Sequence, residues 1–149
     1  MQLVIFIGLQ GSGKSTFYAR RFADTHLRLN MDMLKTRHRE KLLFEACLAA
    51  KQPVVIDNTN PTPEERSRYI MPAKAQGFGV IGYYFQSSVE DCKQRNGSRP
   101  ANCVVPLAGL LGTYKRLVRP TLAESFERLH YVRIGEQNDF VVEEWSDEV

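Results

Sequence analysis

The stretch Gly8-Leu9-Gln10-Gly11-Ser12-Gly13-Lys14-Ser15-Thr16 decides the fold of this chain. A glycine, four further residues and then Gly-Lys-Ser is the spacing of a loop that binds phosphate groups. Glycine has no side chain, so backbone N–H groups in such a loop approach phosphate oxygens closely, and the next helix points its free N–H groups at the same anion. We expect the whole stretch to bind ATP, with Lys14 reaching the β- and γ-phosphates and the Ser15 hydroxyl binding Mg²⁺.

The segments on either side of the loop support this interpretation. Residues 3–7 are apolar and rich in β-branched and aromatic types, which is typical of a buried strand. Residues 15–24 have the spacing of a helix. A glycine-rich turn without a ligand is the alternative, and it is disfavoured because motif, strand and helix agree.

Segments of strand type and helix type alternate along the rest of the chain. We expect further strands at 27–30, 54–57, 80–85 and 129–134, with a small one at 140–143, and helices at 33–50, 63–76, 89–96 and 107–118. This alternation predicts an α/β fold, in which a parallel sheet is covered by helices on both faces. Ligands of such sheets bind at the carboxyl ends of the strands.

Polar residues follow three of the predicted strands at that edge. Asp57 ends an apolar strand, as a carboxylate that supports a metal ion would, and Asn58 follows it. A turn-forming Asp-Asn pair is the alternative for Asp57. Asp32 lies just beyond another strand end, where it is placed to accept a proton from an acceptor hydroxyl, and a plain helix N-cap is its alternative. Gln86 and Ser87 or Ser88 follow the fourth strand, and one of the serines is expected to cap the next helix.

A basic segment passes from helix into loop at residues 93–99. Its arginines, Arg95 and Arg99, suit a lid around residues 95–105 that closes over a triphosphate and neutralises charge in the transition state. A solvated basic helix end is the alternative. His26, His38 and His130 lack the spacing of a metal site.

Charge is unevenly distributed along the 149 residues, which are few enough for one domain. Residues 136–149 hold six acids and no Lys or Arg, so a net charge of +3 for the chain leaves +9 on residues 1–135. We expect a domain at 1–135 and an acidic C-terminal tail at 136–149. The basic body suits polyanions such as nucleic acids, or is simply solvated. The tail contacts a partner, folds back over the basic surface, or is a polar terminus.

Three cysteines without metal spacing fit free thiols in a reducing compartment, so a cytoplasmic location is expected. The first residues lack the pattern of a signal peptide. No apolar run approaches the ~20 residues of a membrane-spanning helix, so we expect no membrane association.

Together these residues resemble the kinase domain of polynucleotide 5′-hydroxyl kinases, both the phage type and the animal kinase–phosphatase type. The resemblance covers most of residues 3–134. Beyond the phosphate loop it rests on Leu29-Asn30-Met31-Asp32, on 55–61, on Arg95-Asn96 with Arg99, and on 119–126. It implies the P-loop kinase fold with a five-stranded parallel sheet in the order 2-3-1-4-5.

The resemblance also implies roles for individual residues. Asp32 would be the general base on the acceptor 5′-hydroxyl, and Lys14 and Ser15 would handle ATP and Mg²⁺. Asp57 would support the metal site or the acceptor, and Arg95 and Arg99 would belong to a lid. The expected acceptor contacts are Asp32, Lys35, Asp57 and Asn58.

Two positions depart from the family's pattern and leave the acceptor open. Met31 stands where an arginine precedes the catalytic aspartate, and Lys35 stands where the phage type has arginine. A lysine does not grip a phosphate bidentately as arginine does. An ATP-dependent polynucleotide 5′-hydroxyl kinase acting on a nucleic acid end is the leading hypothesis. A kinase for a nucleoside, sugar or nucleotide sugar and an ATP-binding module without phosphoryl transfer are the alternatives.

Overall fold

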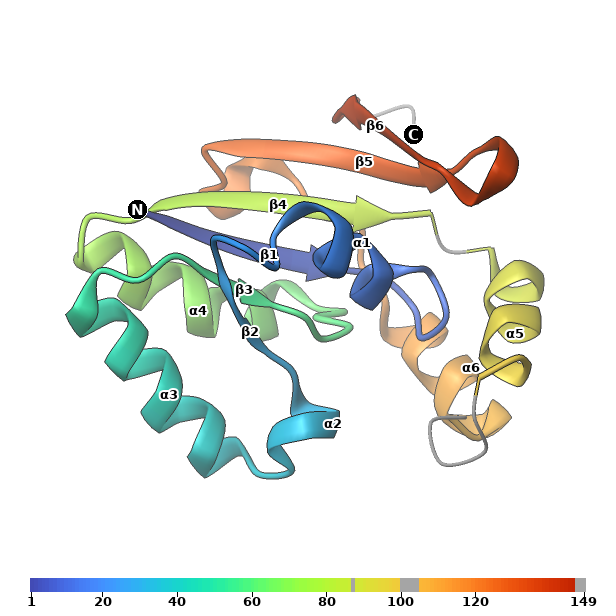
Figure 1. Ribbon diagram of the computed structural model, residues 1–149, viewed down its shortest axis with the longest axis horizontal. Coiled ribbons are helices and arrows are strands. Elements are labelled where there is room, and N and C mark those ends of the chain that lie inside the picture. Colours follow the sequence, from blue (N-terminus) through green and yellow to red (C-terminus); the bar gives the residue numbers. More distant parts are fainter. Residues whose placement is uncertain (87, 100–104, 147–149) are drawn as a thin grey trace.

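Six strands form one sheet, in the order β2-β3-β1-β4-β5-β6, in the computed structural model, which describes residues 1–86, 88–99 and 105–146. The first five strands run parallel and β6 pairs antiparallel with β5 at the edge. The predicted order 2-3-1-4-5 is therefore confirmed, with one antiparallel strand added (Figure 1). The strands are β1 (Gln2–Ile7), β2 (Leu27–Leu29), β3 (Val54–Ile56), β4 (Gly79–Phe85), β5 (Arg128–Ile134) and β6 (Phe140–Glu144).

Helices cover both faces of the sheet because alternate side chains of the central strand β1 are buried on opposite sides. Leu3, Ile5 and Ile7 pack with residues of α3 and α4, whereas Val4 and Phe6 pack with Phe17 of α1. The continuous apolar run of β1 is the pattern of a strand buried on both faces. The helices are α1 (Lys14–Arg21), α2 (Met31–Leu34), α3 (Arg37–Ala50), α4 (Pro63–Ala75), α5 (Val89–Gly97) and α6 (Leu107–Arg116), with 3₁₀ turns η2 (Leu122–Glu124) and η3 (Glu136–Asn138).

The helix expected at 33–50 is two helices, α2 and α3, and this prediction was wrong at its start. Asn30 caps α2, since its side chain accepts a hydrogen bond from the backbone N–H of Met33 at 3.1 Å. Lys35 then takes a positive φ of 73°, which ends α2, and Thr36 caps α3. Two N-caps six positions apart therefore make a short separate turn that carries Asp32.

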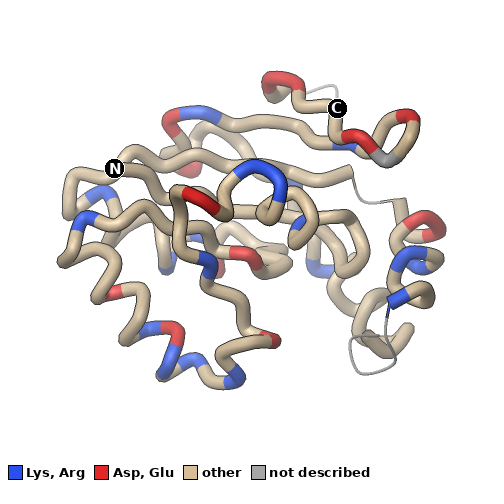
Figure 2. Tube along the Cα trace, viewed as in Figure 1, with Lys and Arg blue, Asp and Glu red and all other residues tan. Residues whose placement is uncertain are grey.

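The acidic C-terminal segment joins the sheet. After η3, β6 pairs with β5, and Val142 lies opposite Val132 in the register. The ring of Phe140 lies 5.1 Å from that of Phe17 in a T-shaped arrangement, so β6 packs on the first helix. Figure 2 shows the acids of this segment at the β5–β6 end of the molecule, away from the lysines and arginines along α3. Residues 147–149 of the expected tail lie outside the described residues.

A buried ion pair fastens α4 to η2. The guanidinium of Arg66 has no exposed surface, and its Nε donates to Glu124 Oε1 at 2.7 Å while its Nη1 donates to the carbonyl of Asn60 at 2.9 Å. The same carboxylate accepts from the backbone N–H of Thr121 at 2.9 Å. The pair holds the segment between α6 and β5 against α4.

We expect Glu124→Gln to lower the free energy of unfolding by about 3 kcal/mol, because it leaves a buried guanidinium without its counter-charge. Urea denaturation followed by circular dichroism measures this change. The matched control is Glu45→Gln on the exposed surface of α3, which should stay within about 0.5 kcal/mol of the parent. Equal effects of the two substitutions would contradict the prediction.

Neither a membrane-spanning helix nor a cluster of metal ligands is present in the part of the chain that the structure describes. No helix there has the length and apolar character needed to cross a membrane. The same residues contain no group of three or more His, Cys, Asp and Glu side chains placed to hold a metal ion.

Candidate active site

A cavity of about 430 Å³ opens at the carboxyl ends of β1, β2 and β3. Residues of the glycine loop form one wall, and residues 30–32 and 57–59 form the wall opposite. Arg95, Arg99 and Val105 line a further side. We call this space the P-loop cavity. The edge of the sheet predicted to bind a ligand is therefore the edge that is hollowed.

The loop takes a conformation that needs glycine at two positions. Gly11 and Gly13 have φ values of 80° and 98°, which side chains rarely tolerate. A Cβ atom at Gly11 would collide with the carbonyl oxygen of Cys92. The side chain of Leu9 is buried against Cys92 and Leu110, so this residue offers only its backbone to a ligand.

Lys14 is buried at the start of α1 and directs its ammonium into the loop. Its Nζ donates to the carbonyls of Gly8 at 3.0 Å and Leu9 at 2.6 Å, and it lies 3.4 Å from Ser12 Oγ. Burial lowers the pKa of Lys14 to about 8, although the negative charge of Asp57 opposes this shift. Phosphate oxygens in the cavity would supply the missing negative charge.

Asp57 sits at the centre of a polar cluster and is 1% exposed. Its Oδ2 accepts from Arg28 Nε at 2.7 Å and from the Ser15 hydroxyl at 3.0 Å, and Arg28 Nη2 donates to Ser15 Oγ at 2.9 Å. Its Oδ1 is buried and has no hydrogen-bond partner within the described part of the chain. One orphaned carboxylate oxygen beside a serine hydroxyl fits Mg²⁺, which takes one or two protein oxygens together with phosphates and water.

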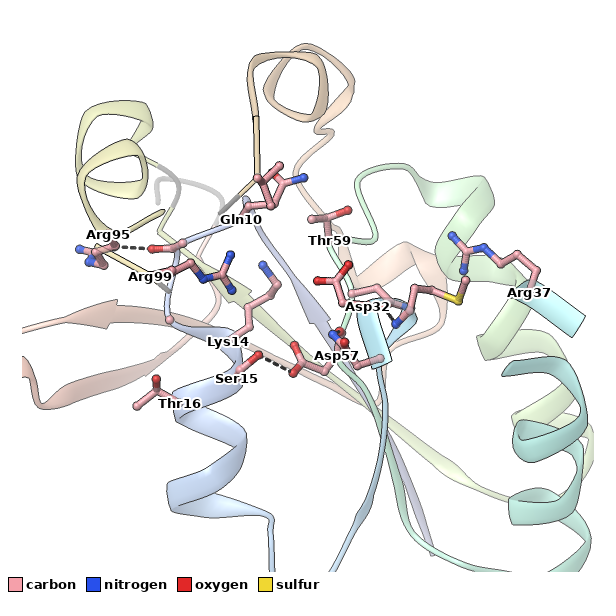
Figure 3. A pocket seen from close by; sticks show the side chains of 16 residues that line it. Gln10, Lys14, Ser15, Thr16, Asp32, Arg37, Asp57, Thr59, Arg95 and Arg99 are labelled. Atoms are coloured by element: carbon pink, nitrogen blue, oxygen red, sulfur yellow. Dashed lines mark hydrogen bonds between the residues drawn. The ribbon is translucent and has the colours of Figure 1, made fainter. Parts of the chain in front are cut away.

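The carboxylate of Asp32 does not cap a helix. Asn30 caps α2 instead, and its Nδ2 also donates to the carbonyl of Asp57 at 2.6 Å. Asp32 is exposed in the second position of α2 and lines the P-loop cavity. Figure 3 shows its carboxylate and the ammonium of Lys14 directed into the same space from opposite walls.

Asn58 fastens the turn that carries Asp32. Its Oδ1 accepts from the backbone N–H of Met31 at 2.9 Å, and its Nδ2 donates to Glu40 Oε2 at 2.9 Å. The buried carboxylate of Glu40 also accepts from the Tyr69 hydroxyl at 2.8 Å and from Arg37 Nη1 at 3.0 Å. Asn58 thus orients the backbone beside Asp32, and it also lines the P-loop cavity, where the sequence predicts a contact with the acceptor.

We expect Glu40→Gln to lower the turnover number about tenfold with little change in ATP affinity, because an amide replaces one of the acceptor oxygens that hold Asn58, Tyr69 and Arg37. Steady-state phosphotransfer kinetics with varied ATP measure both quantities. Glu45→Gln on the exposed side of the same helix is the control. A proportional loss of ATP affinity would instead indicate that α3 shapes the donor site.

The two arginines expected in the lid lie differently. Arg95 Nη1 donates to the carbonyl of Gly11 at 3.1 Å, so its guanidinium braces the loop. Arg99 lies close to Lys14 and points into the cavity (Figure 3). Residues 100–104 of the expected lid lie outside the described residues, as does Ser87, and Ser88 caps α5.

Some contributions were not predicted from the sequence, and one expected residue lies apart. Lys35 is exposed at the end of α2 and is not among the described residues that line the cavity, whereas Arg37, which was not predicted, lines it. Arg28 was missed because its two partners lie thirteen or more positions away. The sequence signal that could have indicated Arg28 is its position as a charged residue between two leucines of a short strand.

Comparison with known proteins agrees with this geometry. Residues 3–120 match the model of a family described as an AAA domain. The chain belongs to this family. The central sheet and loop described above are the P-loop kinase fold of that family.

A fission yeast protein, from Schizosaccharomyces pombe, is 32% identical over 136 residues, which are 88% of this chain and 33% of that protein. It is named a bifunctional polynucleotide phosphatase/kinase, and the resemblance noted in the sequence is thereby confirmed. The chain spans about a third of the length of the curated relatives it matches.

Two solved structures share the fold. Kti12 of Chaetomium thermophilum, in complex with ADP-AlF3, has a TM-score of 0.64 at 19% identity, covering 91% of this chain and 92% of that one. A gluconokinase from Sinorhizobium meliloti 1021 has a TM-score of 0.61 at 19% identity, covering 91% and 83%. At this identity the likeness extends to the fold and leaves the substrate open.

Proposed function

We propose that the protein is an ATP-dependent kinase that transfers the γ-phosphate to the 5′-hydroxyl of a nucleic acid end. The observation that carries the proposal is the placement of Asp32 and Lys14 on opposite walls of one cavity at the phosphate loop. A base and a cation facing each other across a phosphate site are the parts that phosphoryl transfer to an alcohol requires. The relationship to the fission yeast phosphatase/kinase supports the polynucleotide as acceptor.

The chemistry follows from the positions of these groups. The acceptor hydroxyl donates its proton to the Asp32 carboxylate as its oxygen forms a bond to the γ-phosphorus, and the bond from that phosphorus to the bridging oxygen breaks to release ADP. Lys14 and Arg99 neutralise charge on the transferred group. Ser15 and Asp57 would hold Mg²⁺, which supplies charge neutralisation on the phosphates when bound. Arg28 and Asn58 hold Asp57 and the α2 turn in place.

The proposal is tested by transfer of label from γ-labelled ATP to single-stranded DNA and RNA oligonucleotides that carry a 5′-hydroxyl. We expect labelling of these ends and none of matched oligonucleotides that already carry a 5′-phosphate. Nucleotide binding without transfer to any DNA or RNA end would overturn it.

A kinase for a small alcohol is the second candidate. The observation that favours it is that Lys35, at the position where the phage type has arginine, is exposed and is not among the described residues that line the cavity. A panel of nucleosides, sugars and nucleotide sugars, assayed beside the oligonucleotides, separates the two acceptor classes.

The lowered pKa of Lys14 predicts proton uptake when a nucleotide binds. In the free protein this ammonium loses its proton as the pH passes about 8, whereas bound phosphates favour its charged form. We expect ADP binding to take up a fraction of a proton that grows from pH 7 to pH 9, and the affinity to fall above pH 8. Calorimetry in buffers of different ionisation enthalpy measures the uptake. Lys14→Met should abolish that rise, and its persistence in the variant would contradict the assignment to Lys14.

A further inference from the structure

A second cavity, of about 590 Å³, lies at the carboxyl end of β4, beside the middle of β5 and the end of α6. Among the described residues, none that lines it also lines the P-loop cavity. Three tyrosines and two basic side chains form most of its wall, and we call it the tyrosine pocket: Tyr84, Tyr114, Tyr131, Lys115 and Arg119. The roles proposed for the P-loop cavity use none of these residues.

The aromatic rings of the tyrosine pocket are held in fixed positions on one side. Tyr84 and Tyr131 stack with their centroids 6.2 Å apart, and Trp145 packs edge-on against Tyr84 at 5.4 Å. The guanidinium of Arg119 lies 5.7 Å above the ring of Trp145. Tyr114 on α6 is different, since 51% of its surface is exposed and its ring is available to a ligand. Bases of single-stranded nucleic acids stack on aromatic side chains of this kind.

The charges of the pocket favour an anion. No Asp or Glu is among the described residues that line it, whereas Lys115 and Arg119 are both exposed there. Gln86 and Ser88 add polar groups that suit the edge of a base. A planar ring joined to a phosphate, which is a nucleotide unit, satisfies both the rings and the charges of the pocket.

Basic side chains connect the tyrosine pocket with the acceptor side of the P-loop cavity. Arg37 lines the P-loop cavity and also a small cavity of about 60 Å³, where Arg68 and Arg116 join it and Arg116 pairs with Glu65 at 3.3 Å. Arg116 is the neighbour in sequence of Lys115, which lines the tyrosine pocket. The backbone N–H of Val118 donates to the carbonyl of Pro61 at 2.7 Å and holds this segment near the loop after β3.

We infer that the tyrosine pocket binds a nucleotide of a single-stranded acceptor, some distance from the end that reacts at Asp32. This inference rests on the proposed function, which supplies the acceptor strand. The basic side chains that would contact this strand begin at the wall that carries Asp32. A base would stack on Tyr114, and its phosphate would contact Arg119 and Lys115. Binding at this pocket adds affinity for long acceptors and none for short ones.

Binding without catalysis tests the inference directly. Fluorescence anisotropy with a labelled, 5′-phosphorylated oligothymidylate measures affinity for a strand that cannot be phosphorylated at its end. We expect Tyr114→Ala to weaken binding about tenfold, as loss of one stacked base does, and Tyr114→Phe to keep it. Arg119→Ala should reduce the slope of log K against log salt by about 0.7, the effect of one lost phosphate contact on a single strand. Arg128→Ala, at the opposite end of β5, is the matched control.

The outcomes separate this inference from the proposed function. Strand binding that depends on Tyr114 and Arg119 without phosphotransfer would support the pocket and overturn the kinase assignment. Phosphotransfer with unchanged strand affinity in both variants would support the kinase assignment and overturn the inference about the tyrosine pocket. A free mononucleotide that displaces the strand and binds with the same dissociation constant as the strand would identify the pocket as an effector site. That result would overturn the inference. For kinetics, we expect both variants to raise KM for long acceptors and to leave KM for a nucleoside 3′-phosphate unchanged.

Discussion

Replacing Asp32 by asparagine is expected to lower the rate of phosphotransfer about 10³-fold, within the usual range for loss of a general base. The amide has nearly the shape of the carboxylate but does not accept the hydroxyl proton. Asn30 caps α2, so the turn that carries residue 32 does not depend on its carboxylate. We therefore expect the affinity for ADP and the melting temperature to stay close to those of the parent.

Single-turnover transfer from labelled ATP to a 5′-hydroxyl oligonucleotide measures the rate, and calorimetry measures ADP binding. Asp24→Asn is a matched control, because Asp24 is an exposed aspartate beyond the end of α1. A variant that retains more than a tenth of the parent rate would show that the acceptor hydroxyl needs no carboxylate at position 32.

Replacing Lys14 by methionine is expected to lower kcat/KM about 10³-fold, because the charge on the transferred phosphoryl group loses its nearest buried cation. The ammonium is held by two loop carbonyls in the free protein, so it needs to move only locally to meet a phosphate. Because burial lowers the pKa of Lys14 to about 8, below its value of 10.5 in the unfolded chain, the charged form costs stability at neutral pH. We expect the variant without nucleotide to melt no lower than the parent.

Kinetics with varied ATP and thermal unfolding at pH 7 measure these two effects. Lys74→Met, on the exposed surface of α4, is the control. Loss of activity together with a large drop in melting temperature would indicate that the lysine supports the loop itself, and its electrostatic role would have to be abandoned.

The loop, the central strands and the two carboxylates could be predicted because each rests on local sequence. The spacing of residues 8–16 alone predicts a phosphate-binding loop, and Asp57 follows a run of buried residues. The order of the strands in the sheet was implied by the resemblance to polynucleotide kinases, and the pairing of the strands in the structure confirms it. The small strand at 140–143 was predicted, but its antiparallel pairing with β5 and the packing of Phe140 on Phe17 join residues that no local pattern links.

The residues that support the site could not be predicted, because their partners are distant in the chain. Glu40 and Tyr69 lie on different helices and meet at 2.8 Å, and together with Asn58 they fix the turn before Asp32. Arg28 reaches Asp57 from a neighbouring strand. Each is an ordinary charged or aromatic residue in its own segment. Only the fold gives these residues their functions.

The position of β6 has a practical consequence for handling the protein. A Cβ atom at Gly13 would lie 3.1 Å from the ring of Phe140 and 3.2 Å from the side chain of Ile134, so the last hairpin touches the first turn of α1. Trimming the chain after residue 135 would strip this cover from the glycine loop and uncover Phe17. A shortened chain should therefore end beyond Trp145, so that β6 and its contacts with the loop are kept.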